Sequence, residues 1–147
     1  MFNQYFTKGV VSIDGLGTIT GFLFTTPADL RIYARAMVYA SDDFTIQIYE
    51  DVTTLDDGTP ITGFNTNRNS LTAHSMDLFS APTIDDPGDL IWETRTLATK
   101  GIAGVSSQIT YEILVKYSTK YYWKITKNTA ATHFVDYDFW WVEYESI

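Results

Sequence analysis

The chain has 147 residues, ten basic against eighteen acidic side chains, and no cysteine. The length fits one domain over residues 1–147, and the lack of cysteine excludes a disulfide framework and a thiolate metal site. The net charge of −8 argues against nucleic acid as a partner. The sequence contains no run of about 18 apolar residues, so we predict no membrane-spanning helix.

The N-terminal segment MFNQYFTKGVVSIDG lacks the basic start and apolar block of a signal peptide. We therefore expect no secretion signal, and we interpret residues 1–15 as an N-terminal arm. The arm carries three rings, Phe2, Tyr5 and Phe6. These rings either contact another chain or dock on the core of their own chain.

The next two segments have a period near two. Gly17–Thr26 predicts a strand with a glycine at a bend or bulge. The following segment opens with Thr26-Pro27 and Asp29, which is typical of a helix start. From Arg31 onward, however, its residues alternate, so we predict a strand there and keep a short helix as the alternative.

Alternation continues along the rest of the chain, in Phe44–Glu50, Leu90–Thr96, Gln108–Val115, Tyr121–Thr126 and Phe134–Tyr144. Turn signals separate these segments at Asp42–Asp43, Leu55–Pro60, Asp85–Gly88, Ser118–Lys120 and Lys127–Thr129. The last strand carries large rings on both faces, which predicts cover on both sides over part of its length. About eight strands without βαβ alternation predict an all-β fold, an antiparallel β-sandwich or jelly roll.

The segment FNTNRNS (64–70) has almost no apolar content. As a strand it would present Asn65, Asn67 and Asn69 on one side. As an irregular surface loop, its amides would instead bond to neighbouring backbone. In a contact surface Arg68 would be the anchor, because its five donors suit carboxylates or carbonyls of another chain.

Residues for catalysis or metal binding are sparse. His74 and His133 are the only histidines, and neither has a partner at metal-ligand spacing. The runs Asp56-Asp57-Gly58 and Asp85-Asp86-Pro87-Gly88-Asp89 supply only part of a calcium shell, so turns that bond to their own backbone are the favoured interpretation. We predict no catalytic residue, no metal and no cofactor.

Several segments, taken in order, resemble small proteins encoded with the structural genes of tailed bacteriophages. They are RIYARAMVYA, FTIQIYEDVTTLDDGTPI, NTNRNS, TIDDPGDLIWE, YEILVKYSTKYYWKITKN and WWVEYES, and the similarity spans residues 20–145. The resemblance implies a virion protein of the head-decoration or cement type, without enzymatic activity. Such proteins commonly adopt β-sandwich folds, bind the capsid exterior and often form trimers.

For this chain the resemblance implies a site on the capsid surface of the virion, after folding in the host cytoplasm. The implied partners are the major capsid protein and further copies of the chain, with a homotrimer favoured and no nucleic acid or membrane. The contact residues we expect are Asn65, Asn67, Arg68, Asn69, Phe2, Tyr5 and Phe6.

Two other functions stay open at this point. A carbohydrate-binding module of a tail fibre or baseplate would recognise host sugars on a shelf of rings such as Trp92 and Trp123. An envelope hydrolase would need a carboxylate pair across a cleft, for which Asp136 and Asp138 are candidates.

Overall fold

The computed structural model describes residues 2–13, 15–17, 19–40, 43–96, 107–130 and 133–145. Eight long strands build the two main layers: β1 (Phe2–Ile13), β2 (Ile19–Thr25), β3 (Leu30–Ala40), β4 (Phe44–Glu50), β10 (Asp89–Thr96), β11 (Ser107–Val115), β12 (Lys120–Lys127) and β13 (His133–Glu145). Five short strands lie between β4 and β10: β5 (Thr53–Asp56), β6 (Thr59–Ile61), β7 (Phe64–Asn65), β8 (Asp77–Ser80) and β9 (Thr83–Asp86).

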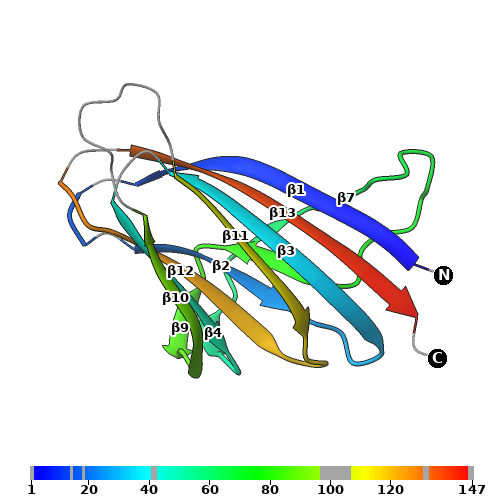
Figure 1. Cartoon of the computed structure of the whole chain (residues 1–147). Helices are drawn as coiled ribbons and strands as arrows, with labels where there is room; N and C mark the ends of the chain where they lie inside the picture. Colours follow the sequence, from blue (N-terminus) through cyan, green and yellow to red (C-terminus); the bar gives the residue numbers. More distant parts are fainter. Residues whose placement is uncertain are drawn as a thin grey trace.

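The eight long strands form a jelly roll, which confirms the predicted fold class. One sheet has the order β11-β3-β13-β1-β7 and the other the order β10-β4-β12-β2-β8-β6. All pairings within these two sheets are antiparallel. The chain crosses between the two layers as it passes from β1 to β2, β3 and β4, and again from β10 to β13 (Figure 1). This is the two-sheet jelly-roll arrangement, with residues 51–88 inserted between β4 and β10.

The core lies between the two sheets because alternate side chains of each long strand point inward. The five-stranded sheet contributes Tyr5, Ile32, Val38, Val135, Phe139 and Trp141, and the six-stranded sheet contributes Phe22, Phe24, Phe44, Ile46, Ile48 and Trp123. The alternation predicted from Arg31 is confirmed, and the helix alternative is wrong. β3 pairs along its length with β11 on one side and β13 on the other.

The expected N-terminal arm is wrong for residues 2–13. These residues form β1, which pairs with β13 from Phe2 opposite Tyr144 to Ile13 opposite His133. The physical reason is burial, because Tyr5, Thr7 and Ile13 all point into the core from one side of the strand. The start of β1 therefore lies beside the end of β13 (Figure 1).

The inserted segment extends both sheets at the same edge of the sandwich. β7 pairs with β1, whereas β8 pairs with β2 and β6 pairs with β8. The predicted turn Leu55–Pro60 is shorter than expected, since β5 reaches Asp56 and β6 begins at Thr59. Gly58, with φ +98°, makes this tight connection, and a Cβ there would lie 2.2 Å from the Ser80 carbonyl oxygen.

Buried tyrosines should make the fold sensitive to alkali. Burial raises the pKa of Tyr121, Tyr122 and Tyr137 above the ordinary value of 10.0. A raised folded-state pKa stabilises the fold below pH 10, and this contribution is lost as the pH rises further, because the unfolded chain ionises first. Chemical denaturation at a series of pH values should show the unfolding free energy falling above pH 10. Tyr122→Phe should make this fall less steep, and a pH-independent free energy across this range would contradict the account.

Candidate functional site

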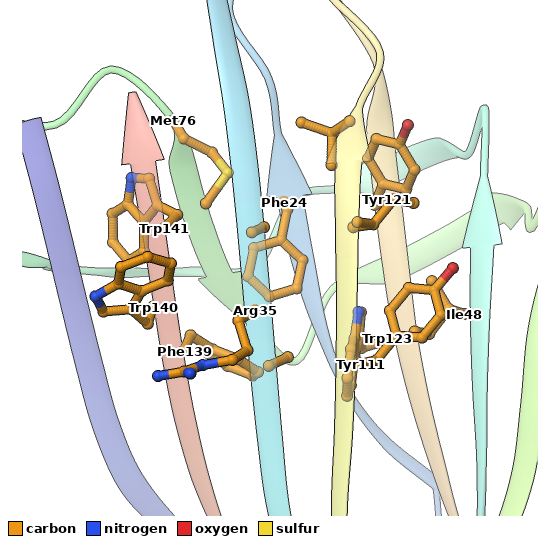
Figure 2. A pocket seen from close by; sticks show the side chains of 14 residues that line it. Phe24, Arg35, Ile48, Met76, Tyr111, Tyr121, Trp123, Phe139, Trp140 and Trp141 are labelled. Carbon is orange, nitrogen blue, oxygen red and sulfur yellow. The ribbon is translucent and has the colours of Figure 1, made fainter. Parts of the chain in front are cut away.

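The gap between the sheets is too small to hold a ligand. An apolar cavity of about 30 Å³ lies there, next to Phe24, Met76, Tyr121 and Trp141 (Figure 2). Ligand pockets measure roughly 300–1,000 Å³, and a cavity known to bind benzene measures about 150 Å³. The candidate sites therefore lie on the outside of the sandwich.

The outer face of the six-stranded sheet is covered by the inserted segment. Leu23 and Tyr122 point outward from this sheet, and Val52 of the insertion buries them in a second small core. Tyr49, Phe79 and Ile84 pack around this cluster. The apolar outer side chains of this layer are thus satisfied within the chain.

The outer face of the five-stranded sheet carries similar side chains without such a cover among the described residues. Register places Glu112, Arg35, Trp140, Phe6 and Phe64 in one row across its five strands. Next to this row, Leu114 lies opposite Tyr33, and at the sheet's end Phe2 lies opposite Tyr144. We call this surface the aromatic face; its rings are Phe2, Phe6, Tyr33, Phe64, Trp140 and Tyr144.

Contacts within the aromatic face hold its rings in place. The Arg35 guanidinium lies 5.1 Å from the centre of the Trp140 ring, and Tyr33 meets the same ring edge-on at 6.2 Å. The Phe6 and Phe64 rings lie 6.0 Å apart, with Arg68 5.0 Å above Phe64. Leu114 (60% exposed) and Phe2 (57% exposed) mark the open rim. Pre-positioned Trp, Tyr and Arg side chains are the residues that contribute most to protein–protein binding.

A polar hollow of about 380 Å³ lies at one end of this face, where β1 meets the FNTNRNS segment. Its walls carry four amides, from Asn3, Gln4, Asn65 and Asn67. The hydroxyls of Thr66, Ser70 and Thr72 and the Phe2 ring complete the lining. We call it the amide hollow.

The FNTNRNS segment is a short strand followed by a turn. Phe64 and Asn65 pair with β1, and Thr66 N donates to the Gln4 carbonyl at 2.9 Å. In the turn, Asn67 N donates to Asn65 Oδ1 at 2.9 Å, and Asn69 N donates to Asn67 Oδ1 at 3.2 Å. Two of the three asparagines therefore bond to neighbouring backbone, the loop alternative that the sequence left open.

The structure distributes the seven predicted contact residues over four environments. Phe6 and Arg68 belong to the aromatic face, whereas Phe2, Asn65 and Asn67 line the amide hollow. Asn69 is exposed in the turn beside the hollow. Tyr5 cannot contact another chain, since it is 1% exposed and its ring stacks on Trp141. The Asn65 side chain is also buried, so its role is mainly structural.

Sequence reasoning missed Tyr33, Arg35, Leu114 and Trp140 as candidate contact residues. The available signal was the outward half of each alternating strand, which is polar in most sandwiches but includes several aromatic rings here. The predicted cover of β13 on both sides over part of its length is confirmed at Val142, which points outward and is 2% exposed. On the same outward side, Phe134 and Tyr144 are 63% and 40% exposed.

One aspartate in each of the two Asp-rich turns bonds to its own backbone, as predicted. Asp56 Oδ1 accepts from Gly58 N at 2.8 Å, and Asp86 Oδ1 accepts from Gly88 N at 2.9 Å. Asp57 accepts from Lys120 Nζ at 2.7 Å, and this bond is the main cause of its lowered pKa. Among the described residues, no cluster of three or more His, Asp or Glu side chains is arranged to hold a metal.

The two histidines have different outcomes. The His74 ring is half-buried against the rings of Tyr5 and Trp141. Its Nε2 atom accepts a hydrogen bond from Gly63 N at 3.1 Å, and its Nδ1 atom lies 2.6 Å from the Met76 carbonyl oxygen. His74 therefore holds the insertion against the core, rather than facing solvent as a polar loop residue would. The side chain of His133 lies outside the described residues.

The residues proposed for sugar binding (Trp92 and Trp123) and for hydrolysis (Asp136 and Asp138) do not have the arrangement that these functions require. Trp123 is 4% exposed in the core, and Trp92 packs against it and against Tyr111, so the pair forms no open shelf. Asp136 and Asp138 point the same way from one strand, toward a shallow depression beside Lys8 and Tyr39. They do not face each other across a cleft, as a glycosidase pair must.

No protein-family model matches the chain, and no curated protein matches it. Among solved structures, the chain is similar to the crystal structure of a mitogen derived from Yersinia pseudotuberculosis, with 12% sequence identity and a TM-score of 0.43. The similarity covers 91% of this chain and 83% of that chain. No helix in the described ranges is long and apolar enough to cross a membrane.

Proposed function

We propose that the chain is a non-enzymatic virion structural protein of the head-decoration type, which attaches to the outside of a phage capsid through its aromatic face. The partner is the major capsid protein, and copies of the chain assemble as a homotrimer at the attachment site. The capsid assignment rests on the resemblance of the sequence to phage structural proteins.

The observation that carries the proposal is the difference between the two outer faces. The insertion buries Leu23 and Tyr122 on one sheet, whereas Leu114, Phe2 and Tyr144 on the other sheet stay exposed. A contiguous exposed apolar patch rimmed by polar residues marks an interaction surface in soluble proteins. The attached protein then stabilises the assembled shell by mass action, because it binds the assembled shell better than free subunits.

The chemistry of the face favours a protein partner. Trp140, Tyr33 and Arg35 combine apolar area with donors that suit carboxylates and carbonyls. An attachment burying roughly 800 Å² per partner is the usual size for a specific complex, and copies in a trimer would add avidity.

Leu114→Glu is expected to weaken capsid attachment at least about tenfold, because it removes an apolar side chain from the contact surface and places a charge there. The control is Leu55→Glu, which makes the same change at a 74% exposed leucine of β5, away from the aromatic face. Both variants should stay folded, since both leucines are exposed. The measurement is co-sedimentation of purified protein with capsids of the encoding phage. Equal binding by the two variants, or no binding by the unaltered chain, would rule out this function.

A further inference from the structure

The amide hollow carries no charged side chain. Charged residues make up 19% of the chain, yet none of the residues that line the hollow is charged. A phosphate or carboxylate ligand would lack a cationic partner there, and a metal ion would lack an anionic one. The lining therefore suits a neutral ligand rich in hydrogen-bonding groups.

The hollow retains unused hydrogen-bonding capacity. Each amide offers two N–H donors and an acceptor oxygen. Asn67 Oδ1 accepts from Asn69 N, but Asn67 Nδ2 makes none of the hydrogen bonds found among the described residues. The contact from Asn65 Nδ2 to Asn3 Oδ1 is 3.5 Å long, as is that from Thr66 Oγ1 to Gln4 Oε1. Contacts of this length are weak and readily exchanged for better ones.

The walls of the hollow are fixed before any ligand arrives. Thr66 is tied to β1 through the Gln4 carbonyl, and Ser70 N donates to the Asn67 carbonyl at 2.9 Å. Thr72 N donates to Ser70 Oγ at 3.2 Å. A preformed site loses little conformational entropy on binding, which favours small ligands.

An aromatic ring stands at the rim of this polar site. Phe2 is 57% exposed and lies 6.0 Å from the ring of Tyr144, which is itself 40% exposed. A sugar ring presents a face of C–H groups, which packs on an aromatic ring, and an edge of hydroxyls, which bond to amides. The volume of about 380 Å³ lies at the lower end of the ligand-pocket range.

We propose that the amide hollow binds a neutral sugar residue, with Phe2 packing on its apolar face and Asn67 Nδ2 donating to a hydroxyl. This is a second activity. It shares the Phe2 ring with the aromatic face, and it uses different side chains from the tryptophan shelf considered from the sequence.

The test is NMR titration of the purified chain with the methyl glycosides of glucose, galactose, mannose and N-acetylglucosamine, following the side-chain amide signals. At least one glycoside should shift the signals of Asn67 and Gln4 with millimolar affinity, typical of a single sugar held by few contacts. If no glycoside shifts these signals, or if the shifts map elsewhere, the proposal is wrong.

Asn67→Asp supplies the sharpest variant. The aspartate keeps the oxygen that accepts from Asn69 N, so the turn is preserved, but it loses the Nδ2 donor. Sugar binding should weaken about tenfold, equivalent to about 1.4 kcal/mol. The matched control is Asn69→Asp, which adds the same charge in the same turn, outside the lining of the hollow. Equal loss in both variants would contradict the proposal, because it would reflect charge alone.

The two functions can be separated in the same set of proteins. Leu114→Glu should retain sugar binding while losing capsid attachment, and Asn67→Asp should show the reverse pattern. If Asn67→Asp instead abolishes capsid attachment and no glycoside binds, the hollow is a protein contact and the sugar proposal fails.

Discussion

Trp141→Ala is expected to reduce the free energy of unfolding by about 3–5 kcal/mol, the usual cost of truncating a fully buried tryptophan. Trp141 is 0% exposed, stacks on Tyr5 at 5.6 Å and meets His74 edge-on at 5.5 Å. Its indole N–H donates to Glu143 Oε1 at 3.2 Å. The substitution therefore leaves a large cavity at the point where the core, β1 and the insertion meet.

The adjacent tryptophan provides the control. Trp140 points to the opposite face of β13, where it contacts Arg35 and Tyr33 on the aromatic face. Trp140 is half-buried, so Trp140→Ala should destabilise the fold less than Trp141→Ala, and it should weaken capsid attachment. Denaturant unfolding measures the first effect and co-sedimentation the second. Equal destabilisation by the two substitutions would show that the aromatic face is part of the folded core.

Glu143→Leu is expected to destabilise the chain by about 2–5 kcal/mol, because it leaves buried donors without an acceptor. Glu143 Oε1 accepts from Ser75 N at 2.7 Å and from Met76 N at 2.8 Å, in addition to the Trp141 indole. One buried carboxylate thus fastens residues 75–76 of the insertion to β13. Hydrogen exchange should show the amides of Ser75 and Met76 losing protection in the variant.

Glu145→Leu is the matched control for this prediction, two residues further along the same strand at an exposed position. A surface substitution of this kind changes the unfolding free energy by no more than roughly 0.5 kcal/mol. If Glu143→Leu is as stable as Glu145→Leu, then the insertion is held by its apolar contacts alone.

The long strands were predictable because their alternation is strong and local. β4 alternates Phe44, Ile46 and Ile48 with polar residues, and these three side chains fill the core as expected. The strand over residues 31–39 was predicted correctly against a helix-start signal at Asp29, since burial of alternate residues between two partner strands outweighs local propensity.

The insertion was not predictable to the same degree. β7 has only two residues, and its partner strand lies about sixty positions earlier in the chain, so no local sequence pattern predicts it. The role of Glu143 could not be predicted for a similar reason. The backbone groups that donate to it, Ser75 N and Met76 N, lie 68 and 67 positions earlier in the chain. Residues 1–15 looked like an arm, since nothing local indicates that β1 pairs with a strand at the other end of the sequence.

The candidate contact surface was found only in part. The composition of FNTNRNS pointed to a contact surface with Arg68 as its anchor. The structure places Arg68 against Phe64 at the edge of the aromatic face. The centre of that face is Trp140 and Arg35, which became neighbours only through the register of β3 with β13. Register cannot be deduced from either strand alone.

An image reconstruction of the decorated capsid would test the central claim most directly. We expect density for the jelly roll on the capsid exterior, with the row from Leu114 through Trp140 to Phe64 turned toward the capsid subunits or a neighbouring copy. The insertion that covers the six-stranded sheet should then face outward. A reconstruction in which the aromatic face points into solvent, or in which the protein is absent from the capsid, would contradict the account.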